Sequence, residues 1–195
     1  MTATHGSVFA YGEHTPELDA SCYLAPGSQV IGRVKLRANV SIWFNTVLRG
    51  DLAAIEIGAG SNIQDNTTVH VEGAEERQDG QERGTVIGSN VTVGHNCIIH
   101  SCVLEDDCLI GMGAVVLGGA VVGAGAVVGA GAVVLEGMRI PPLSLAVGNP
   151  ARVKKTYTPE FVRQVNLRAA EVYRLRIERF KRGLAPIPWP PAPAS

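Results

Sequence analysis

An aliphatic residue returns at every sixth position over much of this 195-residue chain, usually with a small residue after it. The clearest members of the series are Ile110, Val116, Val122, Val128 and Val134. The same frame extends toward the N-terminus through Ile99, Val93 and Ile87, and then through Val69, Ile63 and Ile57. One inward residue in every six predicts a short strand followed by a bend. Three such units close a triangular coil, and aliphatic residues then stack from coil to coil.

The composition agrees with a solenoid and argues against several partners. Glycine is abundant, with 23 residues, and aromatic content is only 5%, which suits a fold with small residues at its corners. The net charge of −1 predicts neither nucleic acid nor an anionic membrane as a partner. The valine-rich stretch 114–135 is long enough for a membrane helix, but its regularly spaced glycines favour the solenoid.

The N-terminus and the cysteines indicate a cytoplasmic protein. Residues 1–12 have neither the basic start nor the apolar run of a secretory signal. Four cysteines lack the C-x-x-C spacing of metal sites, and we expect them to be reduced small hydrophobic residues: Cys22, Cys97, Cys102 and Cys108.

The chain divides into four segments. Residues 1–24 are predicted to cap one end, 25–153 to form the parallel β-helix, 158–183 to form a C-terminal helix, and 184–195 to form a proline-rich extended tail. Thr158, Pro159 and Glu160 carry helix-start signals, and Gly183 ends the helix. Its apolar face is predicted to comprise Phe161, Val165, Ala169, Val172, Leu175 and Phe180, opposite an arginine-rich face.

Two histidines fall on one face of the coil once a single break in the repeat is removed. The segment 73–84 has no aliphatic residue and is predicted to be an excursion loop. Without its 12 residues, His70 and His100 lie 18 positions apart, which is one full coil. Adjacent rungs are about 4.8 Å apart, so both imidazoles could reach one metal ion. Three imidazoles and a water form a catalytic type of metal site.

The third histidine, His95, belongs to the preceding face, because Val93 and Ile99 are consecutive units. It should therefore point away from the His70–His100 pair in its own chain. The simplest arrangement that uses all three histidines is a symmetric homotrimer, in which the His95 of one copy reaches the pair of the next. Each interface would then hold one metal ion.

Further polar residues lie in register with this site. Arg49, with Asp51 after it, reaches the column of His70 if about three residues of the 50–54 stretch bulge out. Asn62, Gln64 and Asp65 stand one unit before His70, where groups that orient metal ligands are needed.

Taken together, Arg49-Gly-Asp51, Asn62-Ile-Gln64-Asp65, His70 and His95-Asn-Cys-Ile-Ile-His100, set within hexapeptide coils, resemble the γ-class carbonic anhydrases. The resemblance implies a homotrimeric lyase with Zn²⁺, or Fe²⁺ or Co²⁺, held between chains by the three histidines. It implies reversible hydration of carbon dioxide to bicarbonate by metal-bound hydroxide, positioned by Gln64. Arg49 and Asp51 would help hold the interface, with Asn62 and Asp65 in support.

The chain departs from the archetype of that family at two positions. Gly73 stands where the archetype has a proton-shuttling glutamate, and Leu52 stands where it has another glutamate. The chain thus resembles the shorter subgroup, many of whose members show weak hydration. Loop residues Glu75, Glu76 and Glu82 could replace the shuttle, but a solvated charged loop is the better interpretation. Tyr173 resembles a helix tyrosine that approaches the metal pocket in this subgroup.

Two other functions fit the same coils. One is a hexapeptide-repeat acyltransferase, or a thioesterase acting on coenzyme A esters; metal-free activity on an acyl-CoA would favour it. The other is a non-catalytic metal-binding or assembly role, in which the sites are inert and one stable partner is recovered.

Overall fold

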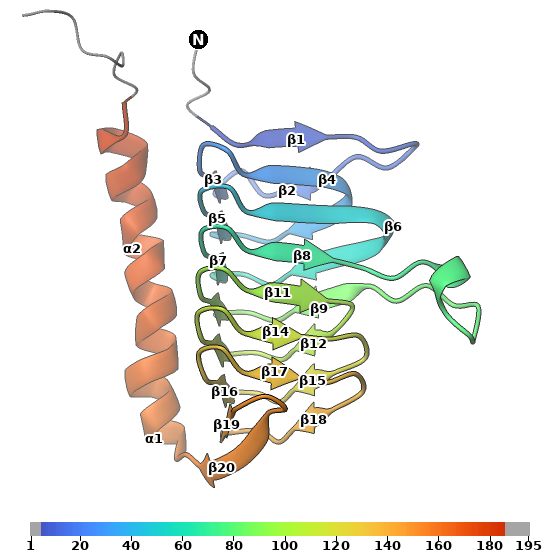
Figure 1. Ribbon diagram of the computed structural model, residues 1–195. Helices are drawn as coiled ribbons and strands as arrows, with labels where there is room; N and C mark the ends of the chain where they lie inside the picture. The colour runs from blue at the N-terminus through green and yellow to red at the C-terminus, as the bar shows by residue number, and fades with distance from the viewer. Residues whose placement is uncertain (1–4, 186–195) are drawn as a thin grey trace, which may run out of the picture.

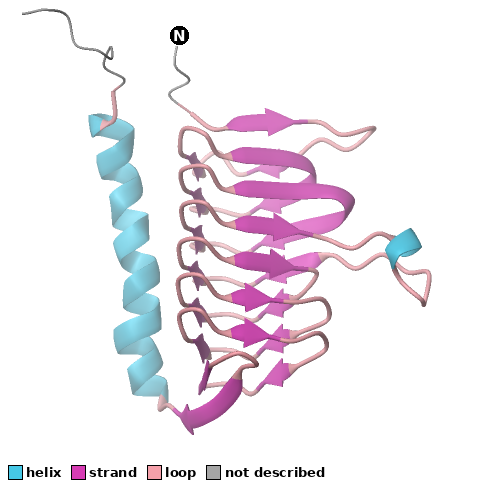
Figure 2. Ribbon diagram, in the orientation of Figure 1, coloured by secondary structure: helices cyan, strands magenta, loops and turns pink. Residues whose placement is uncertain are grey.

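The computed structural model describes residues 5–185 and confirms the predicted fold class. The chain forms a parallel left-handed β-helix with one C-terminal helical segment beside it (Figure 1). Three flat faces make up the triangular coil, and the helix runs along the third of them (Figure 2). Within residues 5–185, no helix is both long enough and apolar enough to cross a membrane.

The faces follow one another along the chain. The first face contains β1 (Ser7–Phe9), β8 (Thr68–His70), β11 (Ile98–His100), β14 (Val115–Val116) and β17 (Val133–Val134). The second contains β2 (Glu17–Leu18), β9 (Thr85–Ile87), β12 (Val103–Leu104), β15 (Val121–Val122) and β18 (Arg139–Ile140). Two longer strands, β4 (Gln29–Leu36) and β6 (Val47–Ile57), bend from the first face onto the second.

The third face is a separate sheet. Its parallel strands are β3 (Tyr23–Leu24), β5 (Ser41–Ile42), β7 (Asn62–Ile63), β10 (Thr92–Val93), β13 (Leu109–Ile110), β16 (Val127–Val128) and β19 (Ser144–Val147). The chain then reverses into β20 (Arg152–Thr156), which pairs antiparallel with β19 and closes that edge of the sheet.

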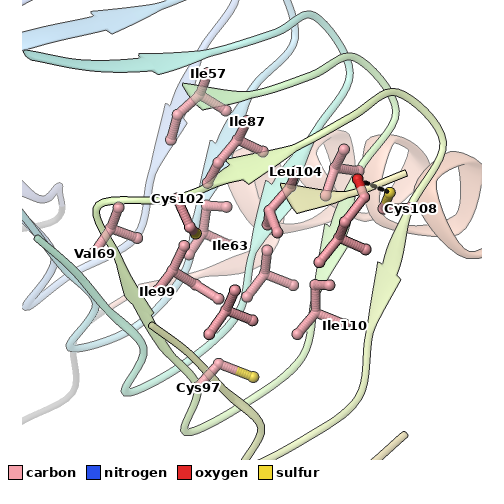
Figure 3. Packing of buried hydrophobic residues seen from close by; sticks show 14 of the residues in the cluster. Ile57, Ile63, Val69, Ile87, Cys97, Ile99, Cys102, Leu104, Cys108 and Ile110 are labelled. Carbon is pink, nitrogen blue, oxygen red and sulfur yellow. Dashed lines mark hydrogen bonds between the residues drawn. The ribbon is translucent and has the colours of Figure 1, made fainter. Parts of the chain in front are cut away.

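Aliphatic side chains from all three faces fill the interior of the coil. Val69 and Ile99 pair across adjacent coils of the first face and are completely buried, as the repeat requires. Figure 3 shows how such residues from successive coils point toward one another. Three of the predicted reduced cysteines, Cys97, Cys102 and Cys108, lie in this core, and all four are free thiols.

Only one of the three corners departs from the six-residue unit. This first corner joins the first face to the second. There, Val30 and Leu36 are six positions apart, but the paired residues of the next coil, Leu48 and Ile57, are nine apart. The three extra residues are the bulge expected after Arg49.

In the coil after that one, the excursion loop occupies the first corner, and it includes the short helix η1 (Ala74–Glu76). One coil further on, Ile99 and Leu104 are only five positions apart, because Ser101 turns the chain with a φ of 47°. The six-residue frame was not expected to shorten here. Every irregularity in corner length is therefore at the corner where strands β8 and β11 end.

Residues 5–24, which belong to the predicted cap, cover the N-terminal end by adding strands to the coil. β1 pairs in parallel with the start of β4, and β2 pairs in parallel with its end. Residues 1–4 and 186–195, and with them most of the predicted proline-rich tail, lie outside the described residues.

The C-terminal helix begins and ends where the sequence signals stand. The Thr158 hydroxyl accepts a hydrogen bond from the Phe161 amide at 3.3 Å, and the helix ends at Gly183. It comprises α1 (Pro159–Val162), the π-helical turn η2 (Arg163–Leu167) and α2 (Arg168–Gly183).

The predicted apolar face of this helix was only partly right: Phe180 packs against the β-helix, and Phe161, Ala169 and Val172 are half-buried. The residues turned toward the β-helix are Val162, Asn166, Ala170, Tyr173, Ile177 and Phe180. Val165 and Leu175 are exposed instead. The face is displaced because a polar residue lies in its centre: the buried Asn166 amide donates to the carbonyls of Asp107 and Gly125, at 2.9 and 3.1 Å. A search for apolar residues alone passes over this position.

Candidate metal centre

His70 and His100 meet at the first corner. They are paired residues of β8 and β11, as the removal of the excursion loop predicts. His70 Nδ1 and His100 Nε2 are 3.3 Å apart, and the ring centroids are 5.3 Å apart. Burial is the largest influence on His70 and lowers the pKa of its imidazole, so the ring is neutral near pH 7. Neutral imidazole is the form that binds metals.

Asp51 and Arg49 flank this pair from the bulge in β6. The second ring nitrogen of His70, Nε2, lies 3.1 Å from Asp51 Oδ1, and the other carboxylate oxygen of Asp51 pairs with the Arg49 guanidinium. Burial acts to raise the pKa of Asp51, but hydrogen bonds from Arg49 and His70 outweigh it, and the pKa lies below its usual range. Asp51 therefore stays ionised and fixes the orientation of the His70 ring.

Glu72 also lies at this corner, although the sequence pattern assigned it no role. Its Oε1 lies 3.8 Å from His100 Nδ1, and Oε2 accepts from Arg77 and Arg83 at 3.1 and 3.3 Å. The alternation of a strand could have revealed it: Val71 points inward and is fully buried, so His70 and Glu72 project to the same side.

The other carboxylates of the excursion loop are engaged elsewhere. Glu82 pairs with Arg33 through two contacts of 3.1 and 2.9 Å, and Glu76 accepts from the Gly73 amide at 3.0 Å. The structure records no contact between these side chains and the histidines within the described part of the chain.

Backbone and hydroxyl groups hold the two histidine strands together. The His70 carbonyl accepts from the Thr85 hydroxyl at 2.7 Å and from the Ser101 amide at 3.1 Å. The Ser101 hydroxyl donates to the Arg83 carbonyl at 2.9 Å, where the excursion loop ends. Thr85 and Ser101 are both fully buried. The shortened turn at Ser101 thus ties His70, His100 and the loop into one unit.

His95 lies at the opposite end of β11, at the third corner, where the third face meets the first. Its Nδ1 is 2.6 Å from Asp65 Oδ2. Asn62 and Gln64 are on the same side of the coil and both are buried: Gln64 donates to Asn62 at 3.1 Å, and Asn62 donates to Thr92 at 2.9 Å. Within one chain, the second group of predicted site residues therefore accompanies His95 and not the His70–His100 pair.

Tyr173 packs at the margin of this second group. Its ring lies edge-on to Trp43, with centroids 5.2 Å apart, and the Arg176 guanidinium stands 4.7 Å from its centre. Burial raises the pKa of the Tyr173 hydroxyl, and the nearby negative charge of Asp65 adds to the effect. Tyr173 is thus a packed residue close to the His95 corner.

The donor set of the first corner suits a zinc-like ion. In a tetrahedral site with metal–nitrogen distances of about 2.0–2.1 Å, two ligand nitrogens lie about 3.3–3.4 Å apart. The His70 and His100 nitrogens are 3.3 Å apart, and one carboxylate backs each ring. Within residues 5–185 of a single chain, however, no three candidate ligands come together.

Comparison with known proteins identifies the fold class first and then the family. Two repeat models match: "Bacterial transferase hexapeptide (six repeats)" over residues 101–136, and "Hexapeptide repeat of succinyl-transferase" over residues 84–117. The class is therefore that of the hexapeptide-repeat β-helix proteins. A carbonic anhydrase of Geobacillus kaustophilus is 38% identical, and the match covers 90% of this chain and 88% of that protein. The chain belongs to the γ carbonic anhydrase family.

Two further similar proteins carry a carbonic anhydrase name and a transferase name. The mitochondrial γ carbonic anhydrase 2 of Arabidopsis thaliana is 41% identical over 80% of this chain, but the match spans only 55% of that protein's length. The crystal structure of a hexapeptide transferase family protein from Anaplasma phagocytophilum superimposes with a TM-score of 0.80, at 35% identity, over 88% of this chain and 96% of that one.

Proposed function

We propose that the chain assembles as a homotrimer that binds a divalent metal between subunits and hydrates carbon dioxide reversibly to bicarbonate. His70 and His100 of one chain and His95 of the next would hold the ion, with zinc as the first expectation and iron or cobalt as alternatives. The observation that carries the proposal is the His70–His100 pair, whose nitrogens are already at the separation of a tetrahedral site. A bound zinc-like ion supplies an activated water at neutral pH.

The first face supports a metal site shared between subunits. One of its edges carries the His70–His100 pair, and the other carries His95. His95 precedes β11 and His100 ends it. Between these edges the face presents a column of outward residues that is mostly apolar: Val47, Thr68, Ile98, Val115 and Val133. Ile98 is 46% exposed in the single chain. Three copies with this face toward a threefold axis would bury the column and join each His100 edge to a His95 edge.

The proposed roles of the other residues follow from their contacts. Asp51 orients His70 by accepting from its second nitrogen, and Arg49 holds Asp51 in place. The Glu72 carboxylate, 3.8 Å from the second nitrogen of His100, favours the orientation of that ring through its charge. Asp65 orients the His95 ring through the contact between its carboxylate and His95 Nδ1. Gln64, fixed by Asn62, brings an amide to the His95 side, where it can position the attacking oxygen. Glu72 is held by two arginines, so it is a positioning residue and not a mobile proton shuttle.

The cytoplasmic location stays a prediction. It is supported by four free thiols, as expected in a reducing compartment.

A complementation experiment tests the shared site directly. His95→Ala and His100→Ala chains are each purified, then unfolded, mixed and refolded together, and metal content and stopped-flow carbon dioxide hydration are measured. Each pure variant should lack all sites. Every mixed trimer should regain one site in three, so an equal random mixture should recover about a quarter of wild-type metal and activity.

The outcomes separate the parts of the proposal. No recovery on mixing, or full metal loading by either pure variant, would refute the shared site. Full metal loading of the wild type without hydration above background would refute the carbonic anhydrase activity and favour a metal-binding or assembly role.

The transferase names of the repeat models and of the superimposable crystal structure keep one alternative open. An acyltransferase or thioesterase acting on a coenzyme A ester would need a general base but no shared metal. Turnover of acetyl-CoA that persists after metal removal by a chelator would support it. The half-buried histidine pair, with a carboxylate beside each ring, favours the metal-dependent reaction instead.

A further inference from the structure

Gly118 lies at the first corner one coil beyond His100, and its missing side chain leaves room for the Glu72 carboxylate. A Cβ atom at residue 118 would overlap Glu72 Oε1, and it would lie 3.1 Å from the Glu72 Cδ and 3.3 Å from Oε2. Oε1 is also the oxygen that stands 3.8 Å from His100 Nδ1. The carboxylate therefore lies beside the His100 ring, in space that any residue except glycine would partly fill.

The repeat itself does not require glycine at this position. Val116 pairs with Val134, so Glu136 is the equivalent of Gly118 in the next coil, where its side chain is exposed. Nor does the backbone require it, because Gly118, unlike Gly119 with its φ of 70°, is not left-handed. Gly118 is buried although it stands at a corner. The absence of a side chain there is explained by the carboxylate that takes its place.

Glu72 is fixed in this space from the other side. Its Oε2 accepts from Arg77 and Arg83 at 3.1 and 3.3 Å. Glu72 and Arg83 also form the neck of the excursion loop, where each amide donates to the other residue's carbonyl, at 3.1 and 2.9 Å. The Arg83 guanidinium in turn lies over Gly119, where a Cβ would come within 2.9 Å of Nη1. The neck of the loop therefore rests on the Gly118–Gly119 turn.

A methyl group at residue 118 would move the carboxylate and not the coil. The backbone of this turn is held between coils: the Gly118 carbonyl accepts from the Gly137 amide at 2.9 Å, and the Gly119 amide donates to the Ser101 carbonyl at 2.7 Å. Glu72 Oε1, in contrast, is at the end of a side chain that can rotate. Its displacement would carry the negative charge away from His100 and disturb the two arginine contacts.

We propose that Gly118 is a positioning residue of the metal centre, which acts through Glu72. Because it has no side chain, it keeps the Glu72 carboxylate beside His100 and the neck of the excursion loop against the coil. The effect on metal affinity rests on the proposed function, because it requires an ion held by His100. The placement of Glu72 does not, because it is a property of the metal-free chain.

Amide hydrogen exchange in the metal-free protein tests the placement of Glu72. Gly118→Ala should raise the exchange rate of the Arg83 amide at least about tenfold, since this amide closes the neck of the loop. Glu72→Ala should raise it to a similar degree, and Gly118→Ala should add nothing to that variant. Glu136→Ala, at the equivalent position of the next coil, is the matched control and should leave the rate unchanged.

Zinc affinity, measured by competition with a chelator, tests the consequence for the metal. Gly118→Ala should lower the affinity about tenfold, within the range for partners of metal ligands. In the Glu72→Ala background the same substitution should cause no further loss, because no carboxylate remains to be displaced. Equal losses in both backgrounds would show that Gly118 acts on the fold and not through Glu72, and would overturn the proposal.

An unchanged exchange rate of Arg83 in Gly118→Ala would overturn the proposal, and so would equal zinc affinities of Gly118→Ala and the wild type. If Gly118→Ala alone does not fold, the double variant should fold, because Glu72→Ala vacates the space; an unfolded double variant would overturn the proposal. A wild type that binds no zinc would refute the proposed metal site, whereas the exchange of Arg83 would still decide whether Gly118 places Glu72.

Discussion

The first corner of the β-helix behaves differently in the two halves of the molecule. After Leu104, every unit at this corner returns to six residues, from Val116 to Val122 and from Val134 to Ile140. Before Leu104, successive coils carry a bulge, an excursion loop and a shortened turn at the same corner. Packing of the aliphatic core requires only that the six-residue unit be repeated from coil to coil. The departures coincide with the side chains that must be brought together, and so they mark the site.

The largest predicted effect is on metal binding. It compares two equivalent positions of the repeat, one in each half of the β-helix. His100 and Leu135 follow Ile99 and Val134, which occupy the same column of the first face. We expect His100→Ala to lower metal affinity more than about 100-fold, because even the partners of ligands are worth 10–100-fold. Leu135→Ala should leave metal content and hydration unchanged. Equal metal loading of the two variants, measured by elemental analysis, would remove the distinction between the halves.

Core substitutions should destabilise the protein to a similar extent in both halves of the β-helix. Ile99 and Ile110 are both completely buried. Ile99→Ala and Ile110→Ala should each reduce the free energy of unfolding of the metal-free protein by about 2–5 kcal/mol, through lost burial and cavity formation. Urea unfolding followed by circular dichroism measures both. A much smaller loss for Ile99→Ala would mean that the irregular half is loosely packed.

Alkaline pH should weaken both halves in the same way. Burial raises the pKa of Cys102 and Cys108 to about 12 each, above the ordinary value of 9.0. Below pH 9 the thiols are neutral in both states and contribute no pH dependence. As the pH rises from 9 toward 12, the thiols ionise in the unfolded chain but not in the folded one, so stability falls.

Cys102→Ala and Cys108→Ala should each reduce this dependence, measured as the urea midpoint between pH 8.5 and 10.5. A dependence as steep in the variants as in the wild type would contradict the assignment to these thiols.

The smallest effect concerns two buried serines. The hydroxyl of Ser101 bonds to the Arg83 carbonyl, and that of Ser144 in the regular half bonds to the Pro141 carbonyl. Each serine-to-alanine change should cost about 1 kcal/mol of stability. Only Ser101→Ala should also weaken metal binding, because Ser101 connects the loop to the histidine strands. Equal metal affinities, determined by competition with a chelator, would show that the shortened turn is purely structural.

Much of the fold could be predicted because the coil has a strict period. Counting by six placed His70 beside His100 across the excursion loop and located the three-residue bulge after Arg49. The shortened turn at Ser101 could not be counted in advance, since its left-handed residue is not a glycine or asparagine. The helix face was misplaced for a related reason: Asn166 is polar, and only its two carbonyl partners on the β-helix make it a contact residue.

The candidate site was predicted in part. Its histidines and their register came from the sequence, and the placement of His95 at a different corner agrees with it. Glu72 was passed over, because its contact with His100 depends on how the excursion loop returns across the corner. Asn62, Gln64 and Asp65 were expected near the histidine pair, yet within one chain they lie with His95.

The sequence by itself determined the β-helix, the column of each repeat residue and the pairing of His70 with His100, because an inward aliphatic every six residues leaves one way to stack the coils. Only the tertiary structure decided how the polar residues divide between the two edges of the first face. That division depends on corner lengths and on contacts between side chains far apart in the chain, which a local period does not encode.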